Sequence, residues 1–178
     1  MTQDEFELKL MLSKEQYEKL SEIFPDSKCK KVVQTNYYYD TINLDMRKKN
    51  TTVRVREKNG KYKLTIKRHY YDCNYSAENN LSIDYASEFI MVEGKKLKLF
   101  GELTTERTEI KLCDGITLML DYNRYLDIED YELELEYVPK SKEKAEGMML
   151  ALQAIICYTG APNLSKSKSE RFFENLLK

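Results

Sequence analysis

Three charged residues at alternate positions near the start of the chain, Glu5, Glu7 and Lys9, are of types that could bind a metal ion and a phosphate group. Alternate side chains of a β-strand point to the same face, so this strand would carry its charges on one side and Phe6 and Leu8 on the other. Carboxylate oxygens suit hard ions such as Mg²⁺ and Mn²⁺, and lysine suits phosphate. The pattern is equally typical of a half-buried strand whose charged face meets water.

A second strand pattern, at residues 131–138, is more acidic. Glu132, Glu134 and Glu136 alternate there with aromatic and aliphatic residues, and Pro139 follows. The chain has one histidine, His69, and four cysteines that lie roughly forty residues apart. This excludes the usual zinc sites and makes a Ser-His-Asp triad improbable. Any metal site would therefore be built from carboxylates.

Basic residues follow the same alternation in the middle of the chain. Two strand-like arms flank Lys58-Asn59-Gly60, a hairpin signal. Arg54 and Arg56 share one face of the first arm, and Lys63 and Lys67 share one face of the second. Paired strands with such a face would repel each other unless anions bind to it. Acidic faces on some strands and basic faces on others therefore predict a site for a metal–polyphosphate complex.

A further hairpin is predicted around Asp114-Gly115, with the signature of a type I′ turn. Arg107 and Glu109 share one face of its first arm, and Asp121 lies on the second arm. This hairpin therefore carries a face of mixed charge.

The remaining elements position these strands. Ser13 and Gln16 form a helix-capping box, and Pro25 ends the helix that follows. Residues 31–41 favour a strand in which the three tyrosines at 37–39 serve packing. We expect irregular structure at 70–82, a weakly amphipathic helix at 84–99, a longer helix at 142–158 and a short helix near the C-terminus.

Length and composition place limits on the protein. The 178 residues suit a single domain, 1–178, and the net charge of −1 gives no bulk attraction to nucleic acid or to an anionic membrane. No stretch is apolar for the length of a membrane span, and no secretory signal opens the chain. We therefore expect a cytoplasmic protein with reduced cysteines, no nucleic-acid partner and no membrane partner.

The alternation predicts an α+β fold in which a closed antiparallel β-barrel has a polar interior and helices packed outside. Buried charges on this scale would have to pair with one another, with metal or with a polyanion. The alternative is an α+β domain whose charged face lies in water.

Taken together and in order, the motifs resemble the CYTH superfamily, the triphosphate tunnel metalloenzymes, and within it the bacterial YjbK-like branch. The first motif has the form ExExK, which is a weak signal alone, whereas the ordered set covers most of the chain. The motifs are Glu5-x-Glu7-x-Lys9, Arg54-x-Arg56-Glu57-Lys58, Lys63-x-Thr65-x-Lys67, Arg107-x-Glu109, Tyr131-Glu132-Leu133-Glu134-x-Glu136 and Lys168-x-x-Arg171-Phe172-Phe173.

The resemblance implies an eight-stranded antiparallel tunnel that binds a linear triphosphate with Mg²⁺ or Mn²⁺. By motif match, the metal ligands would be Glu5, Glu7 and Glu134, with either Glu132 or Glu136 as a further acid. Glu57, Glu109 and Asp121 would orient the basic residues, with a simple ion pair as the alternative for Glu57 and Asp121. The residues that bind phosphate would be Lys9, Arg54, Arg56, Lys63, Lys67 and Arg107, with Lys168 and Arg171 at one mouth.

The implied reaction is attack of a metal-activated water on the terminal phosphorus of inorganic tripolyphosphate or of a nucleotide or thiamine triphosphate. Glu5, Glu7 and Lys9 would be catalytic, and Lys9, crowded by cations, is a candidate for a depressed pKa. A class IV-type adenylate cyclase and a non-catalytic polyphosphate-binding or nucleotide-binding protein are the alternatives. The substrate, the metal and the oligomeric state stay open, with a homodimer as one alternative.

Overall fold

The computed structural model describes residues 6–70, 75–160 and 166–178. These residues divide into two compact units, each described by itself below. Unit 1 comprises the described residues of 33–104 together with 168–178, and unit 2 comprises those of 6–32 and 105–167. The two longest strands contribute residues to both units. None of the described helices is long and apolar enough to cross a lipid bilayer.

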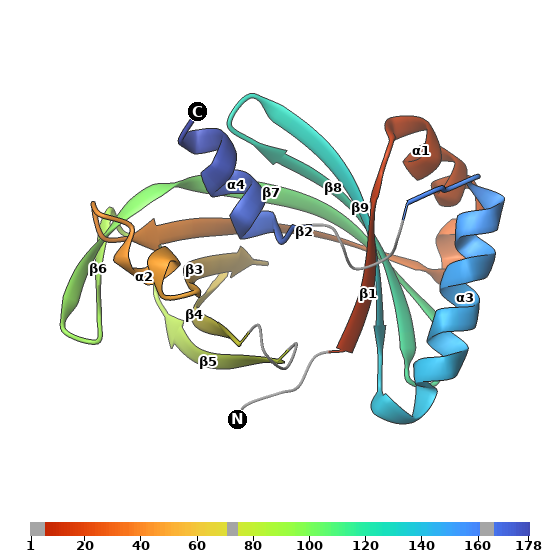
Figure 1. Ribbon diagram of the computed structural model, residues 1–178, viewed down its shortest axis with the longest axis horizontal. Coiled ribbons are helices and arrows are strands. Elements are labelled where there is room, and N and C mark those ends of the chain that lie inside the picture. The colour runs from red at the N-terminus through yellow and green to blue at the C-terminus, as the bar shows by residue number, and fades with distance from the viewer. Residues whose placement is uncertain (1–5, 71–74, 161–165) are drawn as a thin grey trace. The chain divides into compact units, whose positions relative to one another are not determined.

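Nine strands and four α-helices make up the described chain (Figure 1). The strands are β1 (Phe6–Leu12), β2 (Cys29–Asp40), β3 (Thr51–Lys58), β4 (Lys61–Tyr70), β5 (Tyr75–Ile83), β6 (Phe89–Val92), β7 (Lys95–Cys113), β8 (Ile116–Tyr125) and β9 (Ile128–Tyr137). The helices are α1 (Lys14–Ile23), α2 (Asp45–Lys48), α3 (Lys142–Ile155) and α4 (Lys168–Leu176), with 3-10 turns η1 (Asp26–Lys28) and η3 (Pro139–Ser141).

The strands form one sheet in the order β1-β9-β8-β7-β2-β3-β4-β5, and β6 pairs with β7 beside this path. The predicted α+β class with antiparallel strands is confirmed, since neighbours such as β8 and β9 pair antiparallel. The order has two end strands, β1 and β5, so the sheet as described is not closed. It also holds nine strands where eight were expected, because β6 adds a short hairpin to β7.

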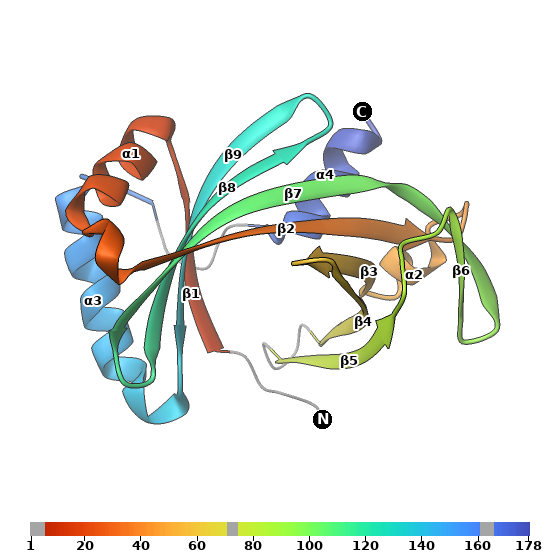
Figure 2. The ribbon, with the colours of Figure 1, turned by 180° about the vertical axis from the view of Figure 1, so that it is seen from behind.

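Unit 2 buries the apolar face of its strands under two helices. Leu8 and Leu10 of β1 and Leu133 of β9 pack in one core with Leu20 of α1 and Met149 of α3. Figure 2 shows α1 and α3 side by side along these strands. The capping box predicted for α1 is confirmed. The Gln16 backbone N–H donates to Ser13 Oγ at 3.2 Å, and the Ser13 backbone N–H donates to Gln16 Oε1 at 3.0 Å.

Unit 1 buries a second apolar core on one face of β2, β3 and β4. Tyr39, Val53 and Val55 pack there with Met46 of α2 and Leu97 of β7. Helix α4 does not follow the expectation that helices pack only on the apolar face. Its Phe172 and Phe173 contact the ring of Tyr38, which alternation places on the opposite, polar face of β2. Thus α4 covers part of the polar face.

Three local predictions were wrong. Residues 84–99 form the β6–β7 hairpin and no helix, because Glu93 and Gly94 both take the positive φ (51° and 73°) of a tight hairpin turn. Strand β5 occupies most of 70–82, where pairing with β4 outweighs a weak strand propensity. The second hairpin lacks a type I′ turn, because Gly115 has positive φ but Asp114 does not.

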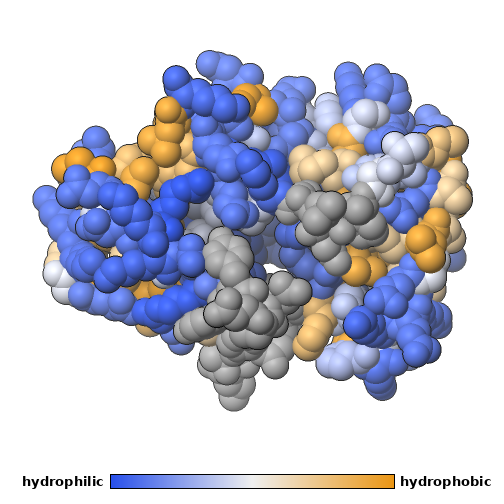
Figure 3. Space-filling model, viewed as in Figure 1, coloured by the Kyte–Doolittle hydropathy of each residue, from blue (hydrophilic) through white to orange (hydrophobic). Residues whose placement is uncertain are grey.

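The described cysteines, Cys29, Cys113 and Cys157, are free, as expected, and Cys73 lies outside the described residues. On the face of the molecule shown in Figure 3, hydrophobic residues occur in small separate groups among hydrophilic ones. Scattered exposed apolar side chains of this kind are normal on a protein surface.

Candidate functional site

The polar face of unit 1 runs across four neighbouring strands. The β2–β3 register places Tyr38 opposite Arg54 and Asn36 opposite Arg56. Next, the β3–β4 register places Arg54 opposite Thr65. Directly opposed residues share a face, so the same side carries the further residues Lys63 and Lys67 of β4 and Glu78 and Asn80 of β5. The hairpin therefore has the predicted basic face, and its polar face continues onto β2 and β5 through uncharged and acidic residues.

Glu78 balances part of this positive charge. Its carboxylate lies 3.6 Å from Arg54 Nη2 and 3.4 Å from Lys67 Nζ. Burial alone raises the pKa of Glu78, but Arg54 and Lys67 lower it more, so the pKa lies below its ordinary value. Glu78 is thus ionised at neutral pH. The sequence analysis missed it, because it lies in a segment without a strong strand pattern.

Three buried donors on this face have no hydrogen-bond acceptor among the described residues: Arg54 Nε, Tyr38 Oη and Asn36 Nδ2. The amide oxygen of Asn36 is used, since it accepts from Arg56 Nε at 3.0 Å. A buried donor without an acceptor is costly and rare, so each such group needs an explanation. A ligand rich in acceptor oxygens would satisfy all three.

The pKa of the Tyr38 hydroxyl also depends on the positive charge around these donors. Burial raises the pKa of its hydroxyl, and the positive charges of Arg54, Lys168, Arg56 and Arg171 oppose that rise. The two residues predicted at one mouth, both on α4, therefore act on the same hydroxyl as the two arginines of β3. The expectation that the three tyrosines serve packing is confirmed. Tyr39 lies in the apolar core with Tyr37 packed against it, and the Tyr38 ring packs against Phe172 and Phe173, while its hydroxyl has no hydrogen-bond partner among the described residues.

The polar face of unit 2 is acidic and centres on Glu134 of β9. The register places Lys9 of β1 opposite Glu134 on one side and Met119 of β8 opposite it on the other. Glu7 pairs in register with Glu136, and Asp121 pairs with Glu132. The predicted acidic residues therefore lie on adjacent strands. Glu5 lies outside the described residues.

Arg107 links two of these acids. Its Nη2 donates to Asp121 Oδ2 at 2.6 Å and to Glu134 Oε2 at 2.5 Å, while its Nε donates to Asp121 Oδ1 at 2.7 Å. Asp121 is fully buried. Burial lowers the pKa of Arg107, but Glu134 and Asp121 raise it more, so it stays protonated. In this arrangement the guanidinium predicted to bind phosphate neutralises carboxylates.

Lys9 forms a similar pair with Glu7, at 2.8 Å between Nζ and Oε1. Burial lowers its pKa, but Glu7, Glu132 and Glu134 raise it more, so the pKa lies above the ordinary value of 10.5. The expectation of a depressed pKa for Lys9 was wrong, because the carboxylates of Glu7, Glu132 and Glu134 raise it. Lys9 is thus placed to hold charge and not to accept a proton at neutral pH.

Glu57 and Glu109 each contact a group other than the predicted phosphate-binding residues. Alternation puts Glu57 on the face of β3 opposite Arg54 and Arg56, and it accepts a hydrogen bond from the Gly60 backbone N–H at 2.6 Å. This differs from the expected orienting role. Glu109 pairs with Lys30 at 2.8 Å.

Carboxylate oxygens are donors that suit Mg²⁺ and Mn²⁺, so the chemistry of the acidic face fits such an ion. Within residues 6–70, 75–160 and 166–178, however, no three acidic, histidine or cysteine side chains are grouped so that they could hold a metal ion. Glu7 and Glu134 are instead engaged by Lys9 and Arg107.

Known families and proteins resemble this chain over most of its length. A family model of the CYTH domain matches residues 3–154. The chain is 30% identical over 184 residues to the Bacillus subtilis (strain 168) protein named "Putative triphosphatase YjbK", and the match covers 96% of this chain and 94% of that protein.

Two solved structures share the fold over nearly the whole chain. A Bacillus halodurans protein described as a "putative adenylate cyclase" is 27% identical, with a TM-score of 0.77, and the match covers 97% of this chain and 98% of that one. HpAC1 from Hippeastrum, described as a "putative adenylyl cyclase" with a dominant triphosphatase activity, is 21% identical with a TM-score of 0.72, over 98% and 96%. The family-model match and the Bacillus subtilis relative show that this chain belongs to the CYTH family.

Proposed function

We propose that this protein is a metal-dependent hydrolase of a linear triphosphate, in which water attacks the terminal phosphorus. The observation that carries the proposal is the polar face of unit 1. Asn36, Tyr38 and Arg54 have buried donors there that lack acceptors among the described residues. A phosphate chain would supply acceptor oxygens for these donors and negative charge that pairs with the cations of this face.

The length of the basic face favours an extended anion. Arg54 and Arg56 are two residues apart on β3, which is about 7 Å along the strand. Lys63 and Lys67 are four residues apart on β4, which is about 13 Å along the strand. The Bacillus subtilis relative is named as a triphosphatase, which supports a chain of three phosphates over a single phosphate. The closed tunnel implied by the family resemblance is part of this proposal.

In the reaction, the water oxygen bonds to the terminal phosphorus while the bond from that phosphorus to the bridging oxygen breaks, releasing inorganic phosphate. Charge spreads over the non-bridging oxygens as this occurs. The guanidinium groups of Arg54 and Arg56 and the ammonium groups of Lys63 and Lys67 stabilise that charge by charge-assisted hydrogen bonds. Lys9 would add one more cation to the phosphate chain.

Glu5, Glu7 and Glu134, with either Glu132 or Glu136, would hold Mg²⁺ or Mn²⁺. When bound, such an ion supplies positive charge to the phosphate oxygens and lowers the pKa of a bound water. Because Lys9 and Arg107 engage two of these acids in the described structure, ion binding would compete with those pairs.

The test is phosphate release from tripolyphosphate, ATP and thiamine triphosphate with Mg²⁺, with Mn²⁺ or with EDTA. We expect release that requires metal and that falls about a hundredfold in Arg54→Gln. The matched control is Arg68→Gln, because Arg68 lies on the other face of β4 and pairs with Glu93. Equal loss in both variants, or release that persists in EDTA, would contradict the proposal.

Two other functions use the same face. The Bacillus halodurans structure is described as a cyclase, and a cyclase would convert ATP to cyclic AMP and pyrophosphate without releasing phosphate. A binding protein would show a higher melting temperature with tripolyphosphate but no product. Chromatography of the ATP products separates a cyclase from the other two functions, and phosphate release from the three triphosphates separates a hydrolase from a binding protein.

A further inference from the structure

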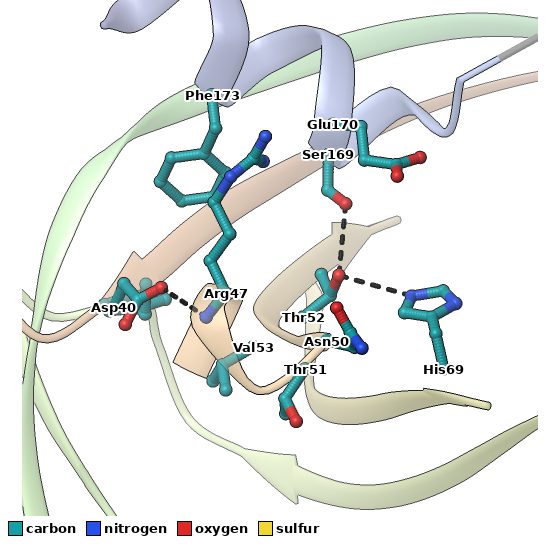
Figure 4. Close-up of a pocket in the computed structure, with 11 residues that line it drawn as sticks. Asp40, Arg47, Asn50, Thr51, Thr52, Val53, His69, Ser169, Glu170 and Phe173 are labelled. Atoms are coloured by element: carbon teal, nitrogen blue, oxygen red, sulfur yellow. Dashed lines mark hydrogen bonds between the residues drawn. The ribbon is translucent and has the colours of Figure 1, made fainter. Parts of the chain in front are cut away.

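A small pocket lies within unit 1 at one end of its polar face, between α2 and α4 (Figure 4). Its volume is about 140 Å³. Thr51 and Thr52 of β3 and His69 of β4 line it, and α4 contributes Ser169 and Phe173. An engineered cavity of about 150 Å³ holds one benzene ring. The pocket therefore has room for a single ring and not for a whole nucleoside.

The pocket continues the basic face described above. Thr52 lies two residues before Arg54 on the same face of β3, which is a step of about 7 Å. It also pairs in register with Lys67, and His69 is two residues beyond Lys67 on β4. A group joined to the end of a phosphate chain on Arg54 and Lys67 would thus reach the pocket.

The side chains that line the pocket suit a neutral ring that carries hydroxyl groups. Thr52 Oγ1 lies 3.1 Å from Ser169 Oγ and 3.5 Å from His69 Nε2, so its hydroxyl sits at the centre of a polar cluster (Figure 4). The Phe173 ring supplies an apolar wall, with the Arg47 guanidinium 5.4 Å from its centroid.

Unlike the basic face, the pocket lining carries more negative than positive charge. Arg47 is its one arginine or lysine among the described residues, and it stands against the carboxylates of Asp40 and Glu170. Asp40 is held in place, since Oδ1 accepts from the Met46 backbone N–H and Oδ2 from the Arg47 backbone N–H, both at 2.9 Å. Two carboxylates in the lining disfavour a further phosphate there.

We propose that this pocket takes the sugar ring of a nucleoside triphosphate whose phosphates lie on the polar face of unit 1. The inference rests on the proposed function and narrows its substrate class to nucleotides, because inorganic tripolyphosphate has no group to fill the pocket. Hydroxyls of the sugar would exchange hydrogen bonds with Thr52 and Ser169, and Phe173 would pack against the ring.

The test compares two ligands and two matched variants. Binding of the β,γ-methylene analogue of ATP and of tripolyphosphate is measured by calorimetry in EDTA, in wild type, Thr52→Val and Thr35→Val. Thr35 Oγ1 also lies 3.1 Å from another hydroxyl, that of Thr104, but outside the pocket. We expect Thr52→Val to lower the affinity for the nucleotide analogue about tenfold, as the loss of one hydrogen bond would, and to leave the affinity for tripolyphosphate unchanged. Thr35→Val should change neither affinity.

Ser169→Leu provides a second variant, which fills the pocket. This variant should lower the affinity for the nucleotide analogue by about tenfold or more and leave the affinity for tripolyphosphate unchanged. The melting temperature of the variant shows whether it is folded. If both variants, once folded, weaken the two ligands equally or not at all, the pocket has no part in binding and the inference is overturned.

The inference and the proposed function fail in different ways. Hydrolysis of tripolyphosphate by a protein that does not bind the nucleotide analogue would overturn the inference and leave the hydrolase standing. Nucleotide-selective weakening in Thr52→Val without hydrolysis of any triphosphate would keep the pocket and reject the hydrolase. If neither ligand binds in EDTA or with Mg²⁺, both are rejected.

Discussion

At the scale of single residues, Arg107 is the group on which the acidic face of unit 2 depends. Its guanidinium donates to the fully buried Asp121 and to Glu134 at 2.5 to 2.7 Å. Two neighbouring carboxylates without a cation would repel each other and would lack donors in a site with little water. We interpret Arg107 as the residue that holds these two acidic side chains together in this conformation.

Replacing Arg107 tests that interpretation. Arg107→Gln should lower the free energy of unfolding by about 3 to 5 kcal/mol, because it removes the cation that pairs with the buried Asp121. The double variant Arg107→Gln/Asp121→Asn should recover a large part of that loss. Urea unfolding of both variants and wild type measures it. A loss below about 1 kcal/mol in the single variant would show that Asp121 does not need this cation.

Glu78 gives a prediction about pH. Its folded pKa is below the ordinary value of 4.5, so its ionisation stabilises the fold above about pH 4.5, and that contribution is lost as the pH falls through the folded pKa. Wild type should therefore be more stable than Glu78→Gln at neutral pH by about 1 to 2 kcal/mol, with the difference shrinking below pH 4.5. Urea unfolding at a series of pH values checks this, and a difference that grows in acid would contradict it.

At the scale of elements, helix α4 is attached to unit 1 by aromatic packing. The Phe172 ring lies 4.9 Å from the ring of Tyr38. Gly101 of β7 makes room for it, since a Cβ there would lie 2.8 Å from Phe172 Cζ, and its φ of +152° is strained for other residues. Close packing of a strand backbone against α4 thus places Ser169, Lys168 and Arg171 at the polar face.

Gly101→Ala should destabilise this attachment by about 1 to 3 kcal/mol, through the clash with Phe172 and the backbone strain. Amide hydrogen exchange should then quicken in α4 more than in α1. The control is Gly147→Ala in α3, where a Cβ would meet nothing within 4 Å and alanine favours the helix. Equal behaviour of the two variants would show that Gly101 is not needed for packing.

At the scale of the whole molecule, the net charge of −1 conceals the separation of charge between strands. A polyanion bound by the basic face would interact with several cations at once, and salt screens such interactions over about 10 Å at 0.1 M. Binding energy then depends on ionic strength even though the net charge is near zero.

Tripolyphosphate should therefore raise the melting temperature, by several degrees at a concentration about a hundred times its Kd, since binding then adds about 2.7 kcal/mol. The shift should shrink as NaCl rises from about 0.05 to about 0.5 M. Differential scanning fluorimetry measures it, with Arg54→Gln expected to show little shift at any salt concentration. A shift that does not depend on salt would mean that charge does not drive binding.

Much of the local structure could be predicted because it depends on neighbours in sequence. The Asn59-Gly60 turn, the Ser13–Gln16 capping box and the faces of β3 and β9 follow from backbone conformation and from alternation. The family could be identified for the same reason, since its motifs are alternating residues on strands.

The sequence by itself thus determined which residues share a face and what charge each face carries, since a period of two residues is a local property of a strand. Only the tertiary structure decided their partners. It placed Glu78 between Arg54 and Lys67, and it surrounded Lys9 with acids. It also left Tyr38 Oη buried without an acceptor among the described residues. Such contacts join strands distant in sequence, and burial changes pKa values and hydrogen-bond demands, so neither can be read from residue spacing.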